Sequence, residues 1–244
     1  MKTKSLLSTS FIILLLVSGS FSFGQTSDKP AKHGPASGGI GFFTPGIHTI
    51  QYSKLNNFLP YGMYQEITNK PFVTGGAGYG IVSNIVIGGE GGNMHAGSFT
   101  KSYQVMDLSG DYGFFSLGYV VMNKKGFLVY PLLSIGNNTL QMYIHQKDMN
   151  PSFAGIVGEP IQAATLHYKS KMLKFSIAGT YAVQGSKSDQ GTAGFLLGFQ
   201  AGYQASYKPG VWTSDNGNVS DGPDFSHNGF FIQLMIGGGG VMRK

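Results

Sequence analysis

Hydrophobic residues alternate with small or polar residues along three segments in the second half of the chain. In residues 193–207, Ala, Phe, Leu and Tyr occupy one set of alternate positions, and Gly, Gln and Ser occupy nearly all of the other set. Residues 173–183 and 230–237 show a similar period of two. Because successive side chains of a strand point to opposite faces, this period predicts β-strands with one apolar face. The longer runs exceed the five or six residues of an ordinary strand.

The small face of these strands indicates what surrounds them. A soluble β-sandwich carries polar and charged residues on its outward face, whereas here that face consists of Gly, Ser and Gln. We therefore expect lipid against the bulky face and a confined interior against the small face. A soluble secreted β-sandwich is the alternative. The same rule applied to an earlier segment sets Val73, Ala77, Tyr79 and Ile81 toward lipid, opposite Thr74, Gly76, Gly78 and Gly80.

The predicted fold is all-β: an antiparallel, transmembrane-type β-barrel of about 8–10 strands, with a short helix in an early long loop. The helix is expected after Ser53, which can cap it, and before Pro60, which would end it. Tight turns are expected at Ser83-Asn84, at 123–126 and at 169–171.

Two further features point to a membrane barrel. Residues 208–226 are polar and rich in Gly, Asp and Asn, and this composition predicts an outer loop. Aromatic residues gather near the expected strand ends, where membrane barrels place aromatic girdles. They are Tyr112, Phe114, Phe115, Tyr119, Tyr130, Tyr168, Tyr181, Tyr203, Tyr207, Phe230 and Phe231.

The first 24 residues have the three parts of a secretory signal peptide. Lys2 and Lys4 give a basic start, residues 6–17 are mostly apolar, and small residues follow at Ser22 and Gly24. The apolar run is shorter than the ~20 residues of a spanning helix. We predict that residues 1–24 are a cleaved signal peptide, 25–36 a flexible lead-in and 37–242 the β-barrel domain. The expected location is the bacterial outer membrane.

Composition and charge exclude several kinds of scaffold, metal site and partner. The chain has 38 Gly among 244 residues, 11% charged residues and no Cys. Without Cys it forms no disulfide scaffold and no thiolate metal site. The excess of 17 Lys and Arg over 11 Asp and Glu is small and scattered, which argues against nucleic acid as a partner. The expected partners are outer-membrane lipid and the outer-membrane assembly machinery.

Sequence signals for catalysis and for cofactor binding are weak. Residues 76–80 lack the G-x-G-x-x-G spacing of a nucleotide loop, and the six His residues show no metal-ligand spacing. His167 and Ser170 are close in sequence, and outer-membrane lipid hydrolases use His and Ser. A turn between these two residues would not place both on one strand face. We predict no catalytic, cofactor-binding or metal-binding residues.

Five polar residues fall on faces that we expect to line the barrel lumen. A single carboxylate or ammonium group in a narrow interior would be costly. We therefore expect Glu90 and Lys174 to pair with each other or with nearby groups, the alternative being that either lies at a wet strand end. The lumen-facing candidates are Glu90, Lys174, Gln200, Gln204 and Gln233.

The chain carries several short motifs rich in Gly, in aromatic residues or in both, together with neighbouring segments of similar character: 75–80 (GGAGYG), 113–119 (GFFSLGY), 130–133 (YPLL), 195–203 (FLLGFQAGY), 220–225 (SDGPDF) and 237–240 (GGGG). Through them the chain resembles the small, uncharacterised, Gly-rich outer-membrane β-barrel proteins of Gram-negative bacteria. The resemblance implies the fold and the location, and it brings no activity. Membrane barrels of this sort usually end in an aromatic residue, whereas this chain ends Val241-Met242-Arg243-Lys244.

The expected function is that of an outer-membrane β-barrel with a structural or surface-interaction role and no catalytic activity. The first alternative is a narrow, porin-like channel or carrier for small solutes or lipids. A barrel enzyme acting on envelope lipids and a soluble secreted β-sandwich that binds a ligand are the others. Conductance, lipid turnover and partition into the aqueous fraction would distinguish them.

Overall fold

The computed structural model describes residues 35–58, 67, 70–101, 104–146, 163–188, 191–215, 217–223 and 225–243. The expected signal peptide, 1–24, and nearly all of the expected lead-in, 25–36, lie outside these residues. No helix among the described residues is long and apolar enough to cross a membrane.

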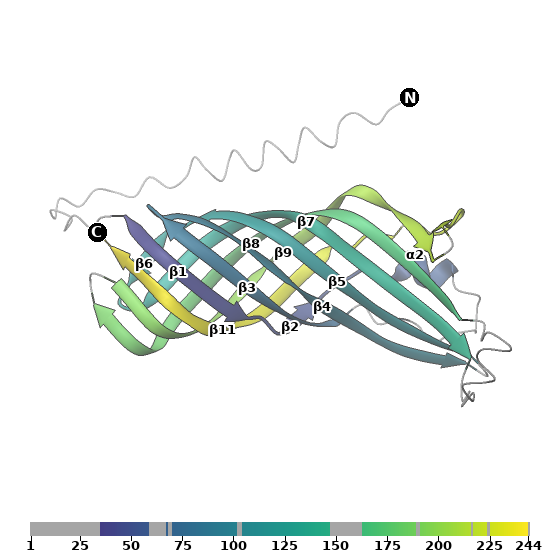
Figure 1. The fold of residues 1–244 in the computed structure, drawn as a ribbon, viewed down its shortest axis with the longest axis horizontal. Coiled ribbons are helices and arrows are strands. Elements are labelled where there is room, and N and C mark those ends of the chain that lie inside the picture. The colour runs from purple at the N-terminus through teal and green to yellow at the C-terminus, as the bar shows by residue number, and fades with distance from the viewer. Residues whose placement is uncertain are drawn as a thin grey trace, which may run out of the picture. The chain divides into compact units, whose positions relative to one another are not determined.

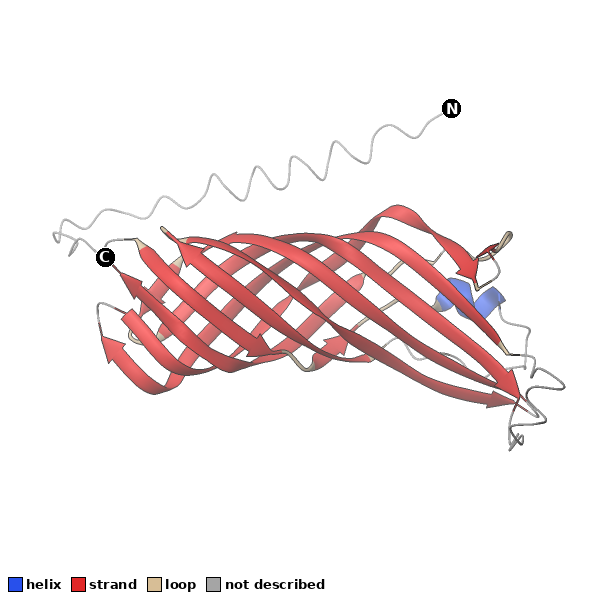
Figure 2. Cartoon of the chain, viewed as in Figure 1, coloured by secondary structure: helices blue, strands red, loops and turns tan. Residues whose placement is uncertain are grey.

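The described chain is almost entirely strand (Figures 1 and 2). In chain order the elements are β1 (Ala36–Phe43), β2 (Gly46–His48), α2 (Ser53–Phe58), β3 (Phe72–Val82), β4 (Ile85–Lys101), β5 (Gln104–Tyr119), β6 (Met122–Lys124), β7 (Phe127–Gln146), β8 (Ala164–Ser188), β9 (Gly191–Ser214), β10 (Gly217–Asn218) and β11 (Gly229–Arg243).

The antiparallel pairings close into a ring. The order is β1–β3–β4–β5–β7–β8–β9–β11, and β11 pairs again with β1. The short β2 lies between β11 and β3, in line with β1, and β6 pairs with β7 beyond the end of β5. Each strand of the ring therefore has a partner on both sides over the paired part of its length, so the sheet closes into a barrel. The predicted transmembrane-type β-barrel is confirmed, and the β-sandwich alternative is wrong.

The register of the pairs shows that the ring is staggered. A path through paired residues leaves β1 at Gly38 and returns, after one circuit, at His48 in β2. The return point is ten residues further along the chain, and a stagger of this kind tilts the strands by roughly 35–45° to the barrel axis. The residues along the path are Gly38, Ile81, Val86, Gly118, Leu132, Ser176, Gly202, Phe231 and His48.

Two of the three predicted tight turns are confirmed. Ser83 and Asn84 have φ angles of 50° and 68°, and Lys125 and Gly126 have φ angles of 50° and 87°. Two successive positive φ angles are typical of type I′ hairpin turns, whose twist matches that of the flanking strands. These turns join β3 to β4 and β6 to β7, and they define what we call the turn end of the barrel. The opposite end, which carries α2, is the mouth (Figure 1).

The predicted turn at 169–171 is wrong, because β8 runs through it without a break. The pairing of β8 with β9 shifts register between Lys169 and Lys171 and again before Met172, which marks a bulge. The two lysines are exposed while Ser170 is buried, so their polarity reflects the outer wall rather than a turn. The predicted outer loop 208–226 is likewise too long, since β9 continues to Ser214 and β10 pairs with it.

The predicted helix is confirmed as α2, at the mouth of the barrel. It begins at Ser53, and Leu55 turns into the core with only 2% of its surface exposed. Asn56 fixes the segment because its side chain accepts a hydrogen bond from the Ile67 N–H (3.1 Å) and donates one to the Ile67 carbonyl (3.3 Å). Pro60 lies outside the described residues.

The alternation predicts the outward faces of β8, β9 and β11 correctly, but the assignment for β3 is reversed. Val73, Tyr79 and Ile81 are buried, whereas Gly76, Gly78 and Gly80 are on the outer wall or close to it. Large side chains on β3 fill the interior next to β4, whose inward positions there include Gly88 and Gly92. A bulky face therefore does not always face lipid.

The aromatic residues also divide between the two faces, so the predicted girdle is only partly correct. The exposed members are Phe115, Tyr119, Tyr181, Tyr203, Tyr207 and Phe230. The others point inward and are buried: Tyr112, Phe114, Tyr130, Tyr168 and Phe231. The interior of the barrel is wide enough to hold large side chains, and these five rings help to fill it.

The inward and outward glycines make a testable contrast. A Cβ added at Gly88 would lie 2.1 Å from the carbonyl oxygen of Gly78, whereas a Cβ at Gly78 itself would meet nothing within 4 Å. We expect Gly88→Ala to lower the free energy of unfolding by about 1–3 kcal/mol, because the backbone of β3 has to move. Gly78→Ala should raise it by about 0.5–1 kcal/mol, because alanine loses less entropy on folding. Urea unfolding in lipid vesicles measures both, and equal effects would contradict the assigned faces.

Candidate functional site

The barrel interior consists of an apolar cluster toward each end, with polar side chains between the two clusters and among their members. The mouth cluster includes Tyr52, Leu55 and Trp212, and the turn-end cluster includes Ile81, Val86 and Leu128. The buried polar residues of the ring strands are Glu90, Ser116, Ser134, Asn138, Ser170, Lys174, Ser176, Thr180, Gln200, Gln204 and Gln233. Side chains therefore fill the interior, as is usual for a barrel of this size.

Glu90 and Lys174 form a buried ion pair across the lumen. The Lys174 ammonium group donates a hydrogen bond to Glu90 Oε1, and the Tyr79 hydroxyl donates to Glu90 Oε2 at 3.4 Å. The ammonium nitrogen also lies 4.0 Å from the centre of the Phe231 ring and 5.4 Å from that of Phe114. A carboxylate, a hydroxyl and two aromatic faces thus replace the water that these charges lose on burial.

The three glutamine candidates are also buried inside the barrel, and the side-chain amide nitrogen of each donates a hydrogen bond. Gln200 Nε2 donates to Ser176 Oγ at 2.9 Å, and Gln204 Nε2 donates to the carbonyl of His227 at 3.1 Å. Gln233 Nε2 lies 3.2 Å from the Tyr112 hydroxyl and 3.3 Å from His48 Nε2. The structure therefore places all five lumen candidates inside. Their side-chain contacts join β4 to β8, β9 to β8, and β11 to β5 and β2.

His167 and Ser170 are not brought together. His167 is half-buried, with its Nε2 4.0 Å from Asp215, whereas Ser170 is buried with its Oγ 3.0 Å from Nδ1 of His227. His227 precedes β11, and burial lowers the pKa of its imidazole to about 3, so the ring is neutral at ordinary pH. The Ser170–His227 pair has almost no solvent exposure, which suits a structural hydrogen bond rather than attack on a substrate.

The sequence did not indicate His48 or His227 as interior residues. His227 directly follows the polar segment 208–226 that was expected to be an outer loop, and His48 lies in a strand of three residues that is too short to show a period. The one available signal was the apolar Phe225 two positions before His227, which packs against Tyr168 with ring centres 5.7 Å apart. Among the described residues, no group of three His, Cys, Asp or Glu side chains could hold a metal ion.

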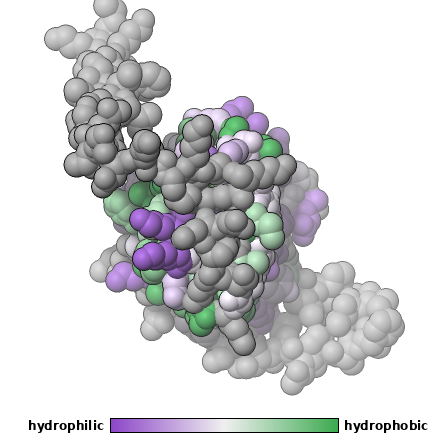
Figure 3. Space-filling model, turned by 90° about the vertical axis from the view of Figure 1, so that its left-hand side faces the viewer, coloured by the Kyte–Doolittle hydropathy of each residue, from purple (hydrophilic) through white to green (hydrophobic). Residues whose placement is uncertain are grey.

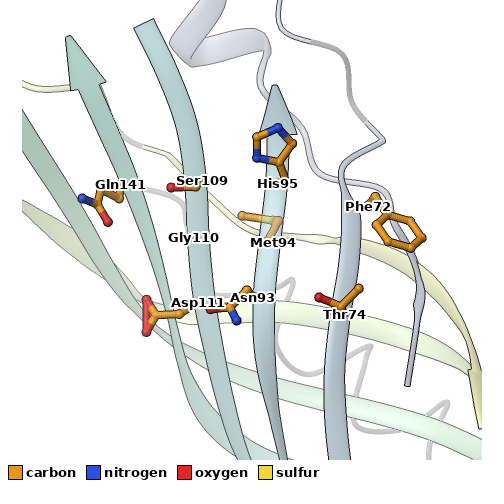
Figure 4. Close-up of a pocket in the computed structure, with 9 residues that line it drawn as sticks. All are labelled: Phe72, Thr74, Asn93, Met94, His95, Ser109, Gly110, Asp111 and Gln141. Atoms are coloured by element: carbon orange, nitrogen blue, oxygen red, sulfur yellow. The ribbon is translucent and has the colours of Figure 1, made fainter. Parts of the chain in front are cut away.

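The outer wall has a polar depression of about 540 Å³ toward the mouth. Figure 4 shows that it spans β3, β4, β5 and β7. Its lining is Phe72, Thr74, Asn93, Met94, His95, Ser109, Gly110, Asp111 and Gln141. Asn93 and Asp111 are paired across β4 and β5, and Gly91, Gly113 and Asn137 form the next outward row toward the turn end. On these strands the outer wall changes from apolar to polar at this level.

No protein-family model matches the sequence, and no curated protein matches it. Solved structures give weak similarities. A major outer membrane protein from Thermus thermophilus is 12% identical with a TM-score of 0.47, covering 85% of this chain and 99% of that one. Ail, the attachment invasion locus protein of Yersinia pestis, is 13% identical with a TM-score of 0.40, covering 86% and 99%. The outer membrane protease OmpT from Escherichia coli is 11% identical with a TM-score of 0.34, covering 87% and 96%. At these values the similarities carry no argument about function.

Proposed function

We propose that the protein is an outer-membrane β-barrel of a Gram-negative bacterium with a structural or surface-interaction role and no catalytic activity. One observation carries the proposal: every strand of the ring exposes a large apolar side chain on its outer face. We call these residues and their outward apolar neighbours the apolar belt. One representative from each ring strand, in chain order, is Phe43, Val82, Ile87, Phe115, Leu133, Phe175, Phe199 and Ile232.

An apolar belt on all sides of a closed barrel suits lipid rather than water. On β7 the outward residues are apolar from Phe127 to Ile135 and then change to Asn137 and Gln141. On β8 the change falls between Leu173 and Lys171. Seen from the turn end, hydrophobic and hydrophilic residues both reach the visible face (Figure 3). The belt would contact outer-membrane lipid after the assembly machinery inserts the barrel.

The packed interior supports a role that does not depend on flow through the barrel. The Glu90–Lys174 pair and the glutamine hydrogen bonds lie across the lumen, with an apolar cluster on either side. A channel for solutes needs a continuous wet path, and tightly packed side chains oppose one. The exposed loops and the outer wall are then the surfaces through which the protein would act.

The test uses the full-length chain, processed by its host and purified from the membrane fraction, then reconstituted in planar lipid bilayers. We expect it to migrate faster on a gel before boiling than after, because a closed barrel stays compact in detergent, and to produce no stepwise conductance. The gel shift also shows that the sample is folded before conductance is measured. A monomer that stays dissolved without detergent would contradict the membrane assignment, and stepwise conductance from folded protein would favour a channel.

A further inference from the structure

A second cavity lies inside the mouth of the barrel, separate from the depression on the outer wall. It has a volume of about 340 Å³. Leu55 of α2, Met142 and Ile144 of β7, Leu166 of β8, Trp212 of β9 and Val219 lie along its wall. Each of these residues either belongs to the mouth cluster or packs against it, so the cavity continues the apolar surface of the core.

The wall of this mouth cavity is chemically apolar. The indole N–H of Trp212 is a strong donor, but it already donates to the carbonyl of Pro223 at 2.8 Å. Ser220 and Asp221, the two remaining polar side chains of the lining, are exposed and lie where the adjoining loop meets water. A polar ligand would lose its hydration and find no buried partner in this wall, whereas an apolar ligand loses little.

The size of the mouth cavity sets the size of a ligand. An engineered apolar protein cavity of about 150 Å³ stays dry and binds benzene, and small-molecule sites generally begin near 300 Å³. The mouth cavity is therefore large enough for an alkyl chain of several carbons or a small aromatic ring system. It is too small for a folded segment of another protein.

We propose that the mouth cavity is a binding site for one small, uncharged, apolar molecule of the alkyl-chain or aromatic-hydrocarbon class. Binding removes apolar ligand surface from water and places it against Leu166, Ile144 and the Trp212 ring. The next side chains toward the centre of the barrel are those of Tyr168, Ser170 and His227, and all three are buried. The site is therefore a binding pocket rather than part of an open passage, and it adds to the proposed function without depending on it.

Trp212 makes the test direct, because it is the single tryptophan of the chain. The full-length protein, folded in lipid vesicles, is titrated with 1-bromoalkanes, whose bromine quenches indole fluorescence on contact. We expect saturable quenching. The apparent affinity should rise by roughly fourfold per added CH₂ (from about 0.8 kcal/mol each) and then level off once the chain fills the cavity. Partition into the bilayer alone would give an affinity that keeps rising with chain length and quenching that does not saturate.

A variant whose cavity is filled by a larger side chain distinguishes quenching by bromoalkane bound in the cavity from quenching by bromoalkane dissolved in the bilayer. Leu166→Phe and, as a second variant, Ile144→Phe should weaken binding of 1-bromooctane at least tenfold. Val211→Phe is the matched control, because Val211 adjoins Trp212 but is 59% exposed on the outer wall, and it should bind as the wild type does. The faster unboiled gel band shows which variants are folded. Absence of quenching in the wild type, or equal quenching in the filled and control variants, would overturn the proposal.

Discussion

Replacing Lys174 by Met, or Glu90 by Leu, is expected to lower the free energy of unfolding by about 3–5 kcal/mol, because each change leaves one charge buried without its partner. The Glu90 carboxylate would keep only the Tyr79 hydroxyl, at 3.4 Å, as a polar contact among those described above. The Lys174 ammonium would keep the faces of Phe231 and Phe114. Urea unfolding of the folded variants in lipid vesicles measures the loss.

The double variant, Glu90→Leu with Lys174→Met, tests whether the loss of stability in the single variants comes from leaving one charge buried without its partner. It is expected to recover most of the stability, because apolar side chains of similar volume often replace a buried ion pair at no net cost. Lys171→Met is the matched control: it makes the same change on β8 at an exposed lysine, where we expect an effect within about 0.5 kcal/mol. If the double variant were as unstable as the sum of the two single variants, the two charges would not be energetically coupled.

The sequence is informative where one physical requirement determines the residue type. Residues 193–207 alternate at every position except Leu196, as expected if lipid meets one face and the packed lumen the other, so strand, period and outward face are all predictable. Ser83-Asn84 is predictable because few residues tolerate two positive φ angles. The pairing of Glu90 with Lys174 was expected because a narrow interior makes a single charge costly.

Prediction was wrong where two environments select the same residue types. On β3 the residue pattern is compatible with either face pointing outward. In the structure Tyr79 fills the lumen, and Gly78 faces open space outside. The lysines at 169 and 171 suit an exposed turn as well as the outer wall of a bulged strand. Trp212 and Leu55 come together at the mouth from positions more than 150 residues apart in the chain. Such contacts depend on barrel closure, which no local pattern reveals.

Replacing Leu133 by Arg is the change that most directly tests whether lipid surrounds the barrel. Leu133 is 60% exposed on β7, within the apolar belt. If that surface faces the hydrocarbon core, an arginine there costs about 2–4 kcal/mol, because its charge leaves water for lipid. If the surface faced water, replacing an exposed leucine would change the free energy of unfolding by no more than about 0.5 kcal/mol. Unfolding by urea in vesicles therefore gives different answers for the two environments.

Gln141→Arg provides the control on the same strand and the same face. Leu133 and Gln141 are eight residues apart on β7, so both side chains point outward, but Gln141 lines the polar depression toward the mouth. Near the interface an arginine costs only about 0–1 kcal/mol, so Gln141→Arg should be nearly neutral. A large loss at Leu133 with little loss at Gln141 would set the edge of the hydrocarbon layer between the two residues, an interval that contains the change from Ile135 to Asn137. Equal, small losses at both positions would mean that the apolar belt is not in contact with lipid.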